Sequence, residues 1–241
     1  MSSVYIDLET LPDMSDGVLD KITEEVAANF KAPSNLTKAQ AGADLGWTGD
    51  KLKYTAAAEV VAAWEQEFAS TKAREVAEQQ WRKQALDPDY GRVCSAVFTL
   101  DGNEYHSFMC EDEKELLECM WITLMRLIPG SDFYAIGHNI TFDLGFLWKR
   151  SIIHDLPIPF KLRPHGRHGH DYFCTMRHWA GYNGRISQSR LCDILGIKGK
   201  PEGMDGSEVL DAYLAGKYAE ILEYNKEDVR QVFEICQRIN R

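Results

Sequence analysis

The chain has 241 residues, of which 44% are hydrophobic and 27% are charged. This is enough apolar material to bury a core, so disorder is not the default expectation for this composition. The formal charge of -10 favours solubility and does not by itself indicate a polyanionic partner. Six widely spaced cysteines, the lack of a signal peptide and the lack of a membrane-length apolar run predict a cytoplasmic protein with reduced thiols and no membrane contact.

The charge is distributed unevenly along the chain. Residues 149–200 contain ten basic and three acidic side chains, a net charge of +7, and the rest of the chain carries -17. An acidic protein with one basic stretch can hold a nucleic acid. The same stretch could equally be an ordinary solvated surface, and charge alone leaves both readings open.

The predicted elements alternate in the manner of a layered α/β domain. Residues 3–8 read as a buried strand, and residues 18–86 have the Ala, Glu, Lys and Gln content of helices. We therefore predict a single domain, 1–241, in which 18–86 is a helical insertion between the first two strands. The remaining expected elements are a hairpin (93–100 and 104–110), a helix (111–130), a strand (133–139), a helix (140–153), a loop (157–171), and helices at 187–197 with Ser187 as cap, 206–216 and 218–239.

Four acids stand at positions that suggest a common site. Asp7 and Glu9 are two residues apart on the first strand, so their side chains share a face. Asp143 falls in the first turn of the helix that follows the strand expected at 133–139, where the helix dipole favours an anion. Asp228 lies on the last helix, and Tyr224, four residues earlier, shares its helical face.

Four carboxylates on one site would repel one another unless cations neutralised them. Hard oxygen ligands suit Mg²⁺ or Mn²⁺, and two such ions about 4 Å apart are a usual arrangement for phosphodiester cleavage. One ion lowers the pKa of the attacking water and the other stabilises the leaving 3′ oxyanion. Each acid also has a simpler interpretation. Asp7 and Glu9 could be a polar pair at the end of a strand, Asp143 an acid that interacts with the helix dipole, and Asp228 part of a solvated helix face.

Three segments in order, "IDLET", "HNITFDLGFL" and "YNKED", resemble the motifs of the DEDD exonuclease superfamily, tyrosine subclass. The resemblance is nearest to stand-alone proteins similar to the 3′–5′ proofreading domain of B-family DNA polymerases. It spans residues 3–12 and 85–240 and leaves the helical insertion without a counterpart. It implies an α/β, ribonuclease H-like fold with a central mixed sheet flanked by helices.

Carried over position by position, the resemblance implies that Asp7, Glu9, Asp143 and Asp228 bind the metals, while Tyr224 orients the nucleophilic water. The chain departs from the pattern at Asn225, where a cysteine often follows the tyrosine. We expect this position to turn away from the Tyr224/Asp228 face without affecting catalysis. The predicted substrate-binding residues are Thr10, Leu11, His138, Asn139, Phe142, Arg163, Arg167, Arg177 and Arg185; of these, Phe142 fits the core better, and the arginines rest only on charge and reach.

Two features leave other interpretations open. Five histidines between His154 and His178 suggest zinc, but their spacing is not a strong zinc signature, and we favour a basic loop that contacts phosphates. Trp47, Trp64 and Trp81 in the insertion could form a lid or a partner surface, although large aromatic side chains mostly pack in cores.

We therefore expect a 3′–5′ exonuclease that releases nucleoside monophosphates from single-stranded DNA 3′ ends with two Mg²⁺ or Mn²⁺ ions. A place in DNA replication or repair would need a polymerase in trans, because little sequence follows the third motif. DNA is favoured over RNA as substrate, and a replication or repair protein could bind the insertion. An exonuclease of RNA or short oligonucleotides on the same fold is one alternative, and an adaptor with a vestigial site is another.

Overall fold

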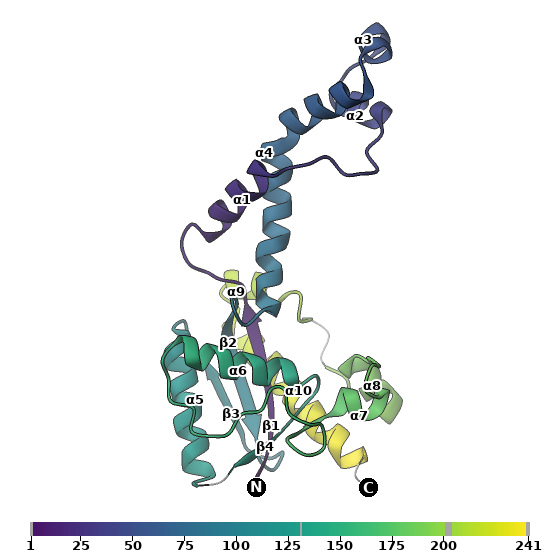
Figure 1. The fold of residues 1–241 in the computed structure, drawn as a ribbon. Helices are drawn as coiled ribbons and strands as arrows, with labels where there is room; N and C mark the ends of the chain where they lie inside the picture. Colours follow the sequence, from purple (N-terminus) through teal and green to yellow (C-terminus); the bar gives the residue numbers. More distant parts are fainter. Residues whose placement is uncertain (1, 131, 201–203, 240–241) are drawn as a thin grey trace. The chain divides into compact units, whose positions relative to one another are not determined.

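The computed structural model describes residues 2–130, 132–200 and 204–239. The chain divides into two compact units, one formed by Met1–Pro12 with Ala85–Arg241 and the other by Asp13–Gln84 (Figure 1). The second unit nearly coincides with the predicted insertion at 18–86. That both units make one exonuclease domain stays a prediction.

The larger unit is built on a mixed sheet of the order β3-β2-β1-β4-β5. The central strand β1 pairs antiparallel with β2 and parallel with β4, while β2–β3 is the expected hairpin and β4–β5 is parallel. A parallel pair needs a crossover between its strands, and helices supply these crossovers here. The strands are β1 (Ser2–Leu11), β2 (Arg92–Thr99), β3 (Tyr105–Met109), β4 (Phe133–Gly137) and β5 (Tyr172–Cys174).

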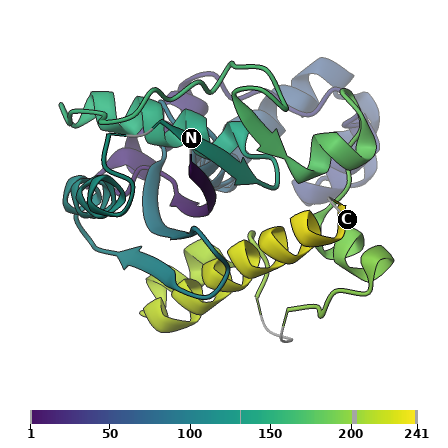
Figure 2. The same cartoon turned by 90° about the horizontal axis from the view of Figure 1, so that it is seen from below.

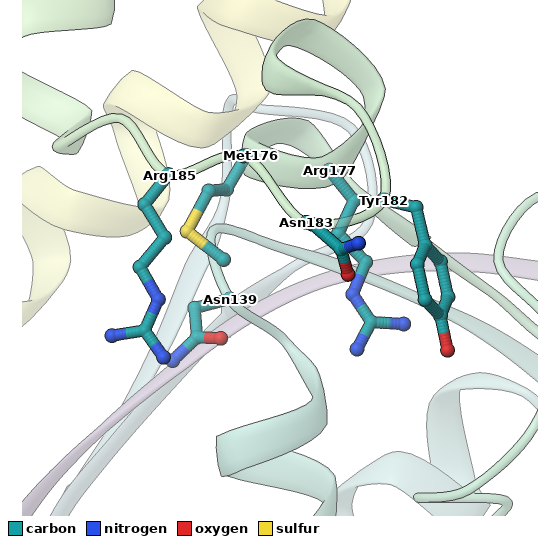
Figure 3. A pocket seen from close by; sticks show the side chains of 7 residues that line it. Asn139, Met176, Arg177, Tyr182, Asn183 and Arg185 are labelled. Carbon is teal, nitrogen blue, oxygen red and sulfur yellow. The ribbon is translucent and has the colours of Figure 1, made fainter.

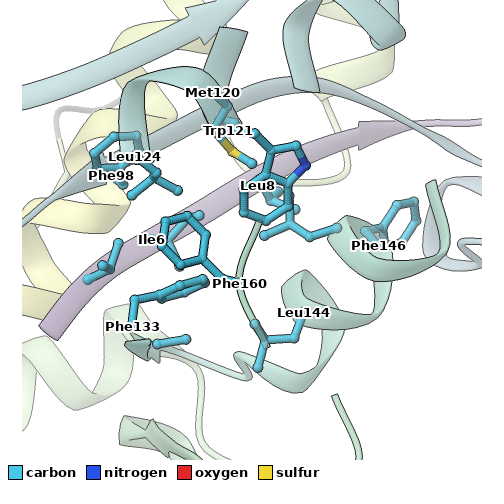
Figure 4. Close-up of a cluster of buried hydrophobic side chains, with 14 of the residues drawn as sticks. Ile6, Leu8, Phe98, Met120, Trp121, Leu124, Phe133, Leu144, Phe146 and Phe160 are labelled. Atoms are coloured by element: carbon cyan, nitrogen blue, oxygen red, sulfur yellow. The ribbon is translucent and has the colours of Figure 1, made fainter. Parts of the chain in front are cut away.

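Helices cover both faces of this sheet. One face packs on α5 and α6, and its core contains Ile6, Leu8, Phe98, Trp121 and Phe146 (Figure 4). The opposite face packs on α10 through a smaller apolar cluster, and Figure 2 shows α10 in yellow along that side. The helices are α5 (Glu113–Leu127), α6 (Thr141–Ile153), α7 (Thr175–Ala180), α8 (Gln188–Leu195), α9 (Val209–Leu214) and α10 (Tyr218–Ile239).

The alternation of side chains along β1 decides where its acids lie. Val4, Ile6 and Leu8 enter the core on the α5/α6 face. Tyr5, one residue out of phase, joins the apolar cluster under α10. Since side chains alternate along a strand, Asp7 and Glu9 continue the Tyr5 row and lie on the α10 face.

The smaller unit consists of four helices. A short 3₁₀ turn begins at its last residue, Gln84. Its apolar cluster centres on Ala41, Val60 and Trp64, and the Trp64 indole N–H donates to Asp44 at 2.8 Å. Trp47 packs against the same cluster, so these tryptophans serve the core. The elements are α1 (Val18–Ala28), α2 (Lys38–Asp44), α3 (Gly49–Tyr54), α4 (Ala57–Lys83) and the 3₁₀ turn Gln84–Leu86.

The sequence predictions and the structure differ mainly between residues 172 and 180. The short strand β5 and the helix α7 that follows it were not predicted, whereas the mixed sheet, the hairpin and the terminal helix were. The Ser187 side chain caps α8 by accepting from the Arg190 N–H at 3.3 Å, as expected. No helix within the described part of the chain is long and apolar enough to cross a membrane.

Candidate active site

Strand β1 carries two of the four acids at a local irregularity. Glu9 is opposite Ser95 and the next residue, Thr10, is opposite Val93, so Cys94 is an extra residue in β2. Such a bulge bends a strand and commonly re-aims the neighbouring side chains. Glu9 is buried and Asp7 is partly exposed, so the pair faces a site that is largely closed to solvent.

Helix α10 brings a third acid from the other end of the chain. One carboxylate oxygen each from Asp7, Glu9 and Asp228 lies within 4.8 Å of the others. Asp228 is buried, and Tyr224, one helical turn earlier, is partly buried beside it. The structure therefore brings together acids that are more than 200 residues apart in sequence.

The fourth acid, Asp143, reaches β1 from its edge. Strand β4 pairs with β1 only as far as Tyr5 and ends at Gly137, which leaves the edge of β1 unpaired beyond that point. The first turn of α6 occupies this edge, where the Leu8 N–H donates to Asp143 Oδ1 at 3.1 Å. Asp143 is almost completely buried and acts electrostatically on both Asp7 and Glu9.

The electrostatics of the cluster oppose its ionisation. Burial, then the charges of Asp143, Asp228 and Glu9, raises the pKa of Asp7 well above its ordinary value. Burial likewise raises the pKa of Glu9, with Asp228 adding to the effect and Lys200 opposing it. Burial also raises the pKa of Asp143 to about 8 and raises that of Asp228. Hard carboxylate oxygens in such a cluster fit divalent cations, because bound positive charge removes the repulsion.

Two side chains outside the predicted set hold Asp228. The Lys200 ammonium donates to Asp228 Oδ2 at 2.5 Å and lies 3.4 Å from the centre of the Tyr224 ring. From the other side, Gln188 Nε2 donates to Asp228 Oδ1 at 2.7 Å. Neither residue belongs to a recognisable motif, and only the fold brings them to the acids.

The Tyr224 hydroxyl is held in its neutral form. Burial, with the charges of Asp228, Glu9 and Asp7, raises the pKa of Tyr224 far above its usual value. The phenol therefore stays protonated at any physiological pH and can both donate and accept a hydrogen bond.

Asn225, the residue after the tyrosine, is fully buried between α10 and the sheet. In the amide orientation that satisfies its neighbours, its NH₂ group donates to the Asp7 carbonyl at 3.2 Å. Its oxygen accepts from the Glu9 N–H at 3.1 Å and from the Ser95 hydroxyl at 3.3 Å. The Asn225 side chain thus points at the backbone of β1, the strand that carries Asp7 and Glu9.

Two of the predicted substrate contacts are not supported by the structure. Leu11 is completely buried, so its side chain is not accessible to a substrate. Both ring nitrogens of His138 are engaged: Nε2–H donates to the Ile186 carbonyl at 2.9 Å, and Nδ1 lies 2.8 Å from the Thr175 hydroxyl. Burial lowers the pKa of His138, which favours the neutral ring with Nδ1 as acceptor. His138 therefore joins β4 to α7 and to the segment before α8.

Three other predicted substrate residues differ in their exposure and contacts. Thr10 is partly exposed and its hydroxyl donates to the Ala85 carbonyl at 2.6 Å. Phe142 packs against Phe146 with ring centres 4.8 Å apart and borders the core, as the core reading expected, while one part of it remains accessible. Arg163 is exposed and paired with Asp171.

The remaining predicted residues line two adjoining grooves. Asn139, Arg177 and Arg185 line a cavity of about 330 Å³, and Figure 3 shows their side chains projecting into the same space. Asn139, Phe142, Arg167 and Arg177 line a second cavity of about 790 Å³. Asn139 has a positive φ of 65°, which asparagine tolerates better than most residues, and it leads from β4 into α6.

The histidine-rich loop does not form a metal site among the described residues. Among the described residues, the only group of three candidate metal ligands is Asp7, Glu9 and Asp228, which lie outside this loop. His154 instead contacts Glu113 at 2.7 Å, and His168 lies 3.2 Å from the Cys174 carbonyl.

A mixed sheet flanked by helices, with acids from β1, α6 and α10 at one site, defines an α/β protein of the ribonuclease H-like exonuclease class. A family model matches residues 96–241, and the chain belongs to that family, described as predicted 3′-5′ exonucleases related to the exonuclease domain of PolB. Neither curated proteins nor solved structures gave a match.

Family membership has direct consequences for this chain. The protein is a hydrolase of the exonuclease type, its substrate is a nucleic acid, and it needs a divalent metal. The matched region contains Asp143, Tyr224 and Asp228, whereas β1 with Asp7 and Glu9 precedes it. It is the fold that joins these two acids to the matched region.

Proposed function

We propose that the protein removes nucleoside 5′-monophosphates one at a time from the 3′ end of single-stranded DNA. The observation that carries this proposal is the convergence of Asp7, Glu9 and Asp228 within 4.8 Å, beside Asp143 and a neutral Tyr224. A protein without a metal would gain nothing from burying these mutually repelling carboxylates.

In this proposal Asp7, Glu9, Asp143 and Asp228 hold two Mg²⁺ or Mn²⁺ ions. The bound ions would supply a water of lowered pKa and stabilise the negative charge that develops on the leaving 3′ oxygen. Asp143 also has a structural task, because its bond to Leu8 fixes α6 against the strand that carries Asp7 and Glu9.

Tyr224 positions the attacking water and does not remove its proton. A phenol whose pKa lies above its usual value is a poor base at neutral pH, but its hydroxyl can orient a water through a hydrogen bond. The aromatic ring is itself fixed, because it is partly buried and the Lys200 ammonium lies against it.

Substrate binding is assigned to the surface that continues from Asn139. Arg167, Arg177 and Arg185 give this surface positive charge for phosphates, and Asn139 offers an amide close to the start of α6. A replication or repair partner bound by the 18–86 region remains a prediction from sequence.

The test is digestion of 5′-labelled single-stranded DNA and of its RNA counterpart with Mg²⁺, Mn²⁺ or EDTA. Wild type is compared with Asp7→Ala and with Glu104→Ala, a control that removes an exposed acid on the β2–β3 turn. We expect a 3′-end ladder on DNA with metal, present in the control and lost in EDTA and in Asp7→Ala. Faster digestion of RNA would reassign the substrate, and no ladder from folded protein would refute the proposal.

A further inference from the structure

A basic groove with an exposed tyrosine lies beside the start of α6, the helix that carries Asp143. The two cavities share Asn139, Arg177 and Tyr182, so they adjoin each other and together make up this groove. Arg167, Arg177 and Arg185 line it, and among the described residues that line it none is acidic. In a protein with a net charge of -10, such a surface favours an anionic ligand.

Tyr182 is presented in an unusual way. Its side chain is 84% exposed although it carries a large aromatic ring. The Arg177 guanidinium lies 5.6 Å from the ring centre, and Arg177 is itself fixed by donating to the Tyr172 hydroxyl at 2.7 Å. Figure 3 shows the Arg177 and Tyr182 side chains next to each other at one end of the groove.

We propose that this groove binds the single strand behind its terminal nucleotide, with a base stacked on Tyr182 and phosphates held by Arg177 and Arg185. The inference rests on the proposed function and adds a substrate subsite to it. Asn139, Thr141 and Phe142 line the groove and come just before Asp143 in the chain, so a strand with its 3′ end at the acids would continue along this groove. Stacking on an aromatic ring accepts any base, which suits an enzyme that must digest every sequence.

The test separates long from minimal substrates. Thymidine 5′-monophosphate p-nitrophenyl ester can occupy the acidic site alone, whereas a fluorescein-labelled oligothymidylate would also fill the groove. For Tyr182→Ala we expect the Kd of the oligonucleotide in EDTA to rise roughly 5- to 150-fold, the factor for about 1–3 kcal/mol of stacking. Hydrolysis of the ester should stay within about twofold of wild type, and Tyr182→Phe should behave as wild type because it keeps the ring.

The matched control is Tyr54→Ala, which removes a tyrosine of similar exposure, 74%, from the helical unit. Unchanged oligonucleotide affinity in Tyr182→Ala would overturn the subsite, and so would equal losses in Tyr182→Ala and Tyr54→Ala. If wild type cleaves neither substrate, the proposed function itself fails. Oligonucleotide binding in EDTA would still decide the subsite in that case.

A second inference comes from Asn225 and is independent of the groove. The side-chain amide of Asn225 forms hydrogen bonds with both the Asp7 carbonyl and the Glu9 N–H. A single side chain therefore contacts the backbone of both acids of β1. Asn225 also stands next to Tyr224 and three residues before Asp228 on α10. Asn225 therefore links α10 to β1 directly by hydrogen bonds, and these two elements carry three of the four acids.

We infer that Asn225 is a positioning residue that holds the α10 acid in register with the β1 acids for metal binding. A shift between α10 and β1 would separate Asp228 from Asp7 and Glu9, whose oxygens now lie within 4.8 Å. The bulge at Cys94 interrupts the regular pairing of β1 and β2 at this point, so the ladder alone does not fix the strand.

The test measures Mn²⁺ affinity by calorimetry in Asn225→Ala and in Asn225→Leu, which keeps the branched shape of the side chain without its polar atoms. We expect the Kd for Mn²⁺ and the Mg²⁺ concentration for half-maximal rate to rise roughly 10-fold or more, with the KM for DNA nearly unchanged. The control is Ser151→Ala, which removes a buried hydrogen bond to Trp121 in the α5/α6 core and should lower stability but leave metal affinity unchanged.

If either folded Asn225 variant binds Mn²⁺ with wild-type affinity, Asn225 does not position the acids for metal binding, and the inference is overturned. If wild-type protein itself binds no Mn²⁺, the proposed function fails first. Ser95→Ala, which removes only one of the three hydrogen bonds of Asn225, provides a milder change and should raise the Kd in the same direction by a smaller factor.

Discussion

The carboxylate of Asp143 accepts a hydrogen bond from the backbone N–H of Leu8 at 3.1 Å, across 135 residues of sequence. Leu8 lies between Asp7 and Glu9, so this bond aligns three of the four acids. It forms where the pairing between β4 and β1 has ended, and the fold thereby turns an unpaired strand edge into part of the site.

Asp143→Asn should separate the structural and chemical tasks of this residue. The amide oxygen can still accept from Leu8, whereas the negative charge is lost. We expect exonuclease activity to fall at least about 100-fold while the metal-free protein at pH 8 is as stable as wild type or more stable. Asp143→Ala should lose the same activity and also about 1–3 kcal/mol of stability, because the Leu8 N–H is left without a partner. Urea unfolding in EDTA measures the difference, and equal stability of the two variants would contradict this assignment.

The stability of the metal-free protein should fall as the pH rises from about 4 to about 8. Folding raises the pKa of Asp143 to about 8 and raises those of the other three acids, so the folded state binds more protons than the unfolded state in this interval. Each such group favours the folded state at low pH and loses that contribution as the pH passes through its folded pKa.

Thermal unfolding in EDTA across this range checks the prediction. Added Mg²⁺ should raise the melting temperature more at pH 8 than at pH 5, because metal binding requires deprotonated ligands. A stabilisation by Mg²⁺ that is independent of pH would show that these carboxylates are not the ligands.

Lys200→Met should increase the affinity for metal. The ammonium bonded to Asp228 supplies positive charge at the same carboxylates and competes with a divalent ion for them. Its removal should lower the Mg²⁺ concentration for half-maximal rate roughly 3- to 10-fold at pH 8. Lys198→Met, which changes a nearby lysine of the same loop, is the control. An unchanged Mg²⁺ requirement with a lower maximal rate would instead place Lys200 on the substrate.

Glu113 provides a test of the scaffold apart from the site. Its buried carboxylate accepts from the Val93 N–H at 2.7 Å and from Arg150 at 2.8 Å, and it contacts His154. Glu113→Ala would leave the Arg150 charge buried without its partner, and we expect a loss of roughly 3–5 kcal/mol in the free energy of unfolding. Glu118→Ala, an exposed acid on the same helix, should change stability by less than about 0.5 kcal/mol. Activity per folded molecule should survive in both variants.

The sequence predicted those parts of the site that depend on local periodicity. The two-residue spacing of Asp7 and Glu9 and the four-residue spacing of Tyr224 and Asp228 follow from strand and helix geometry alone. The mixed sheet and exonuclease class are confirmed by the topology and the family match.

The rest depended on long-range packing that no local pattern reveals. β5 has three residues and is held by parallel pairing to β4, so its sequence alone gives little signal. Leu11 and His138 looked available for substrate, but the fold buries the first and satisfies both nitrogens of the second. For Asn225, helix periodicity concerns only its place on α10, whereas its hydrogen-bond partners lie on β1 and β2.

The most direct test of the central claim is a Mn²⁺ titration followed by electron paramagnetic resonance, with the proposed product thymidine 5′-monophosphate present. Wild type is compared with Asp7→Asn and Asp228→Asn, one ligand from each end of the chain. The structure predicts that wild type binds two Mn²⁺ ions and that each variant loses at least one or binds it roughly 100-fold more weakly. Wild-type stoichiometry and affinity in both variants would contradict the assignment of this acidic cluster as the metal site.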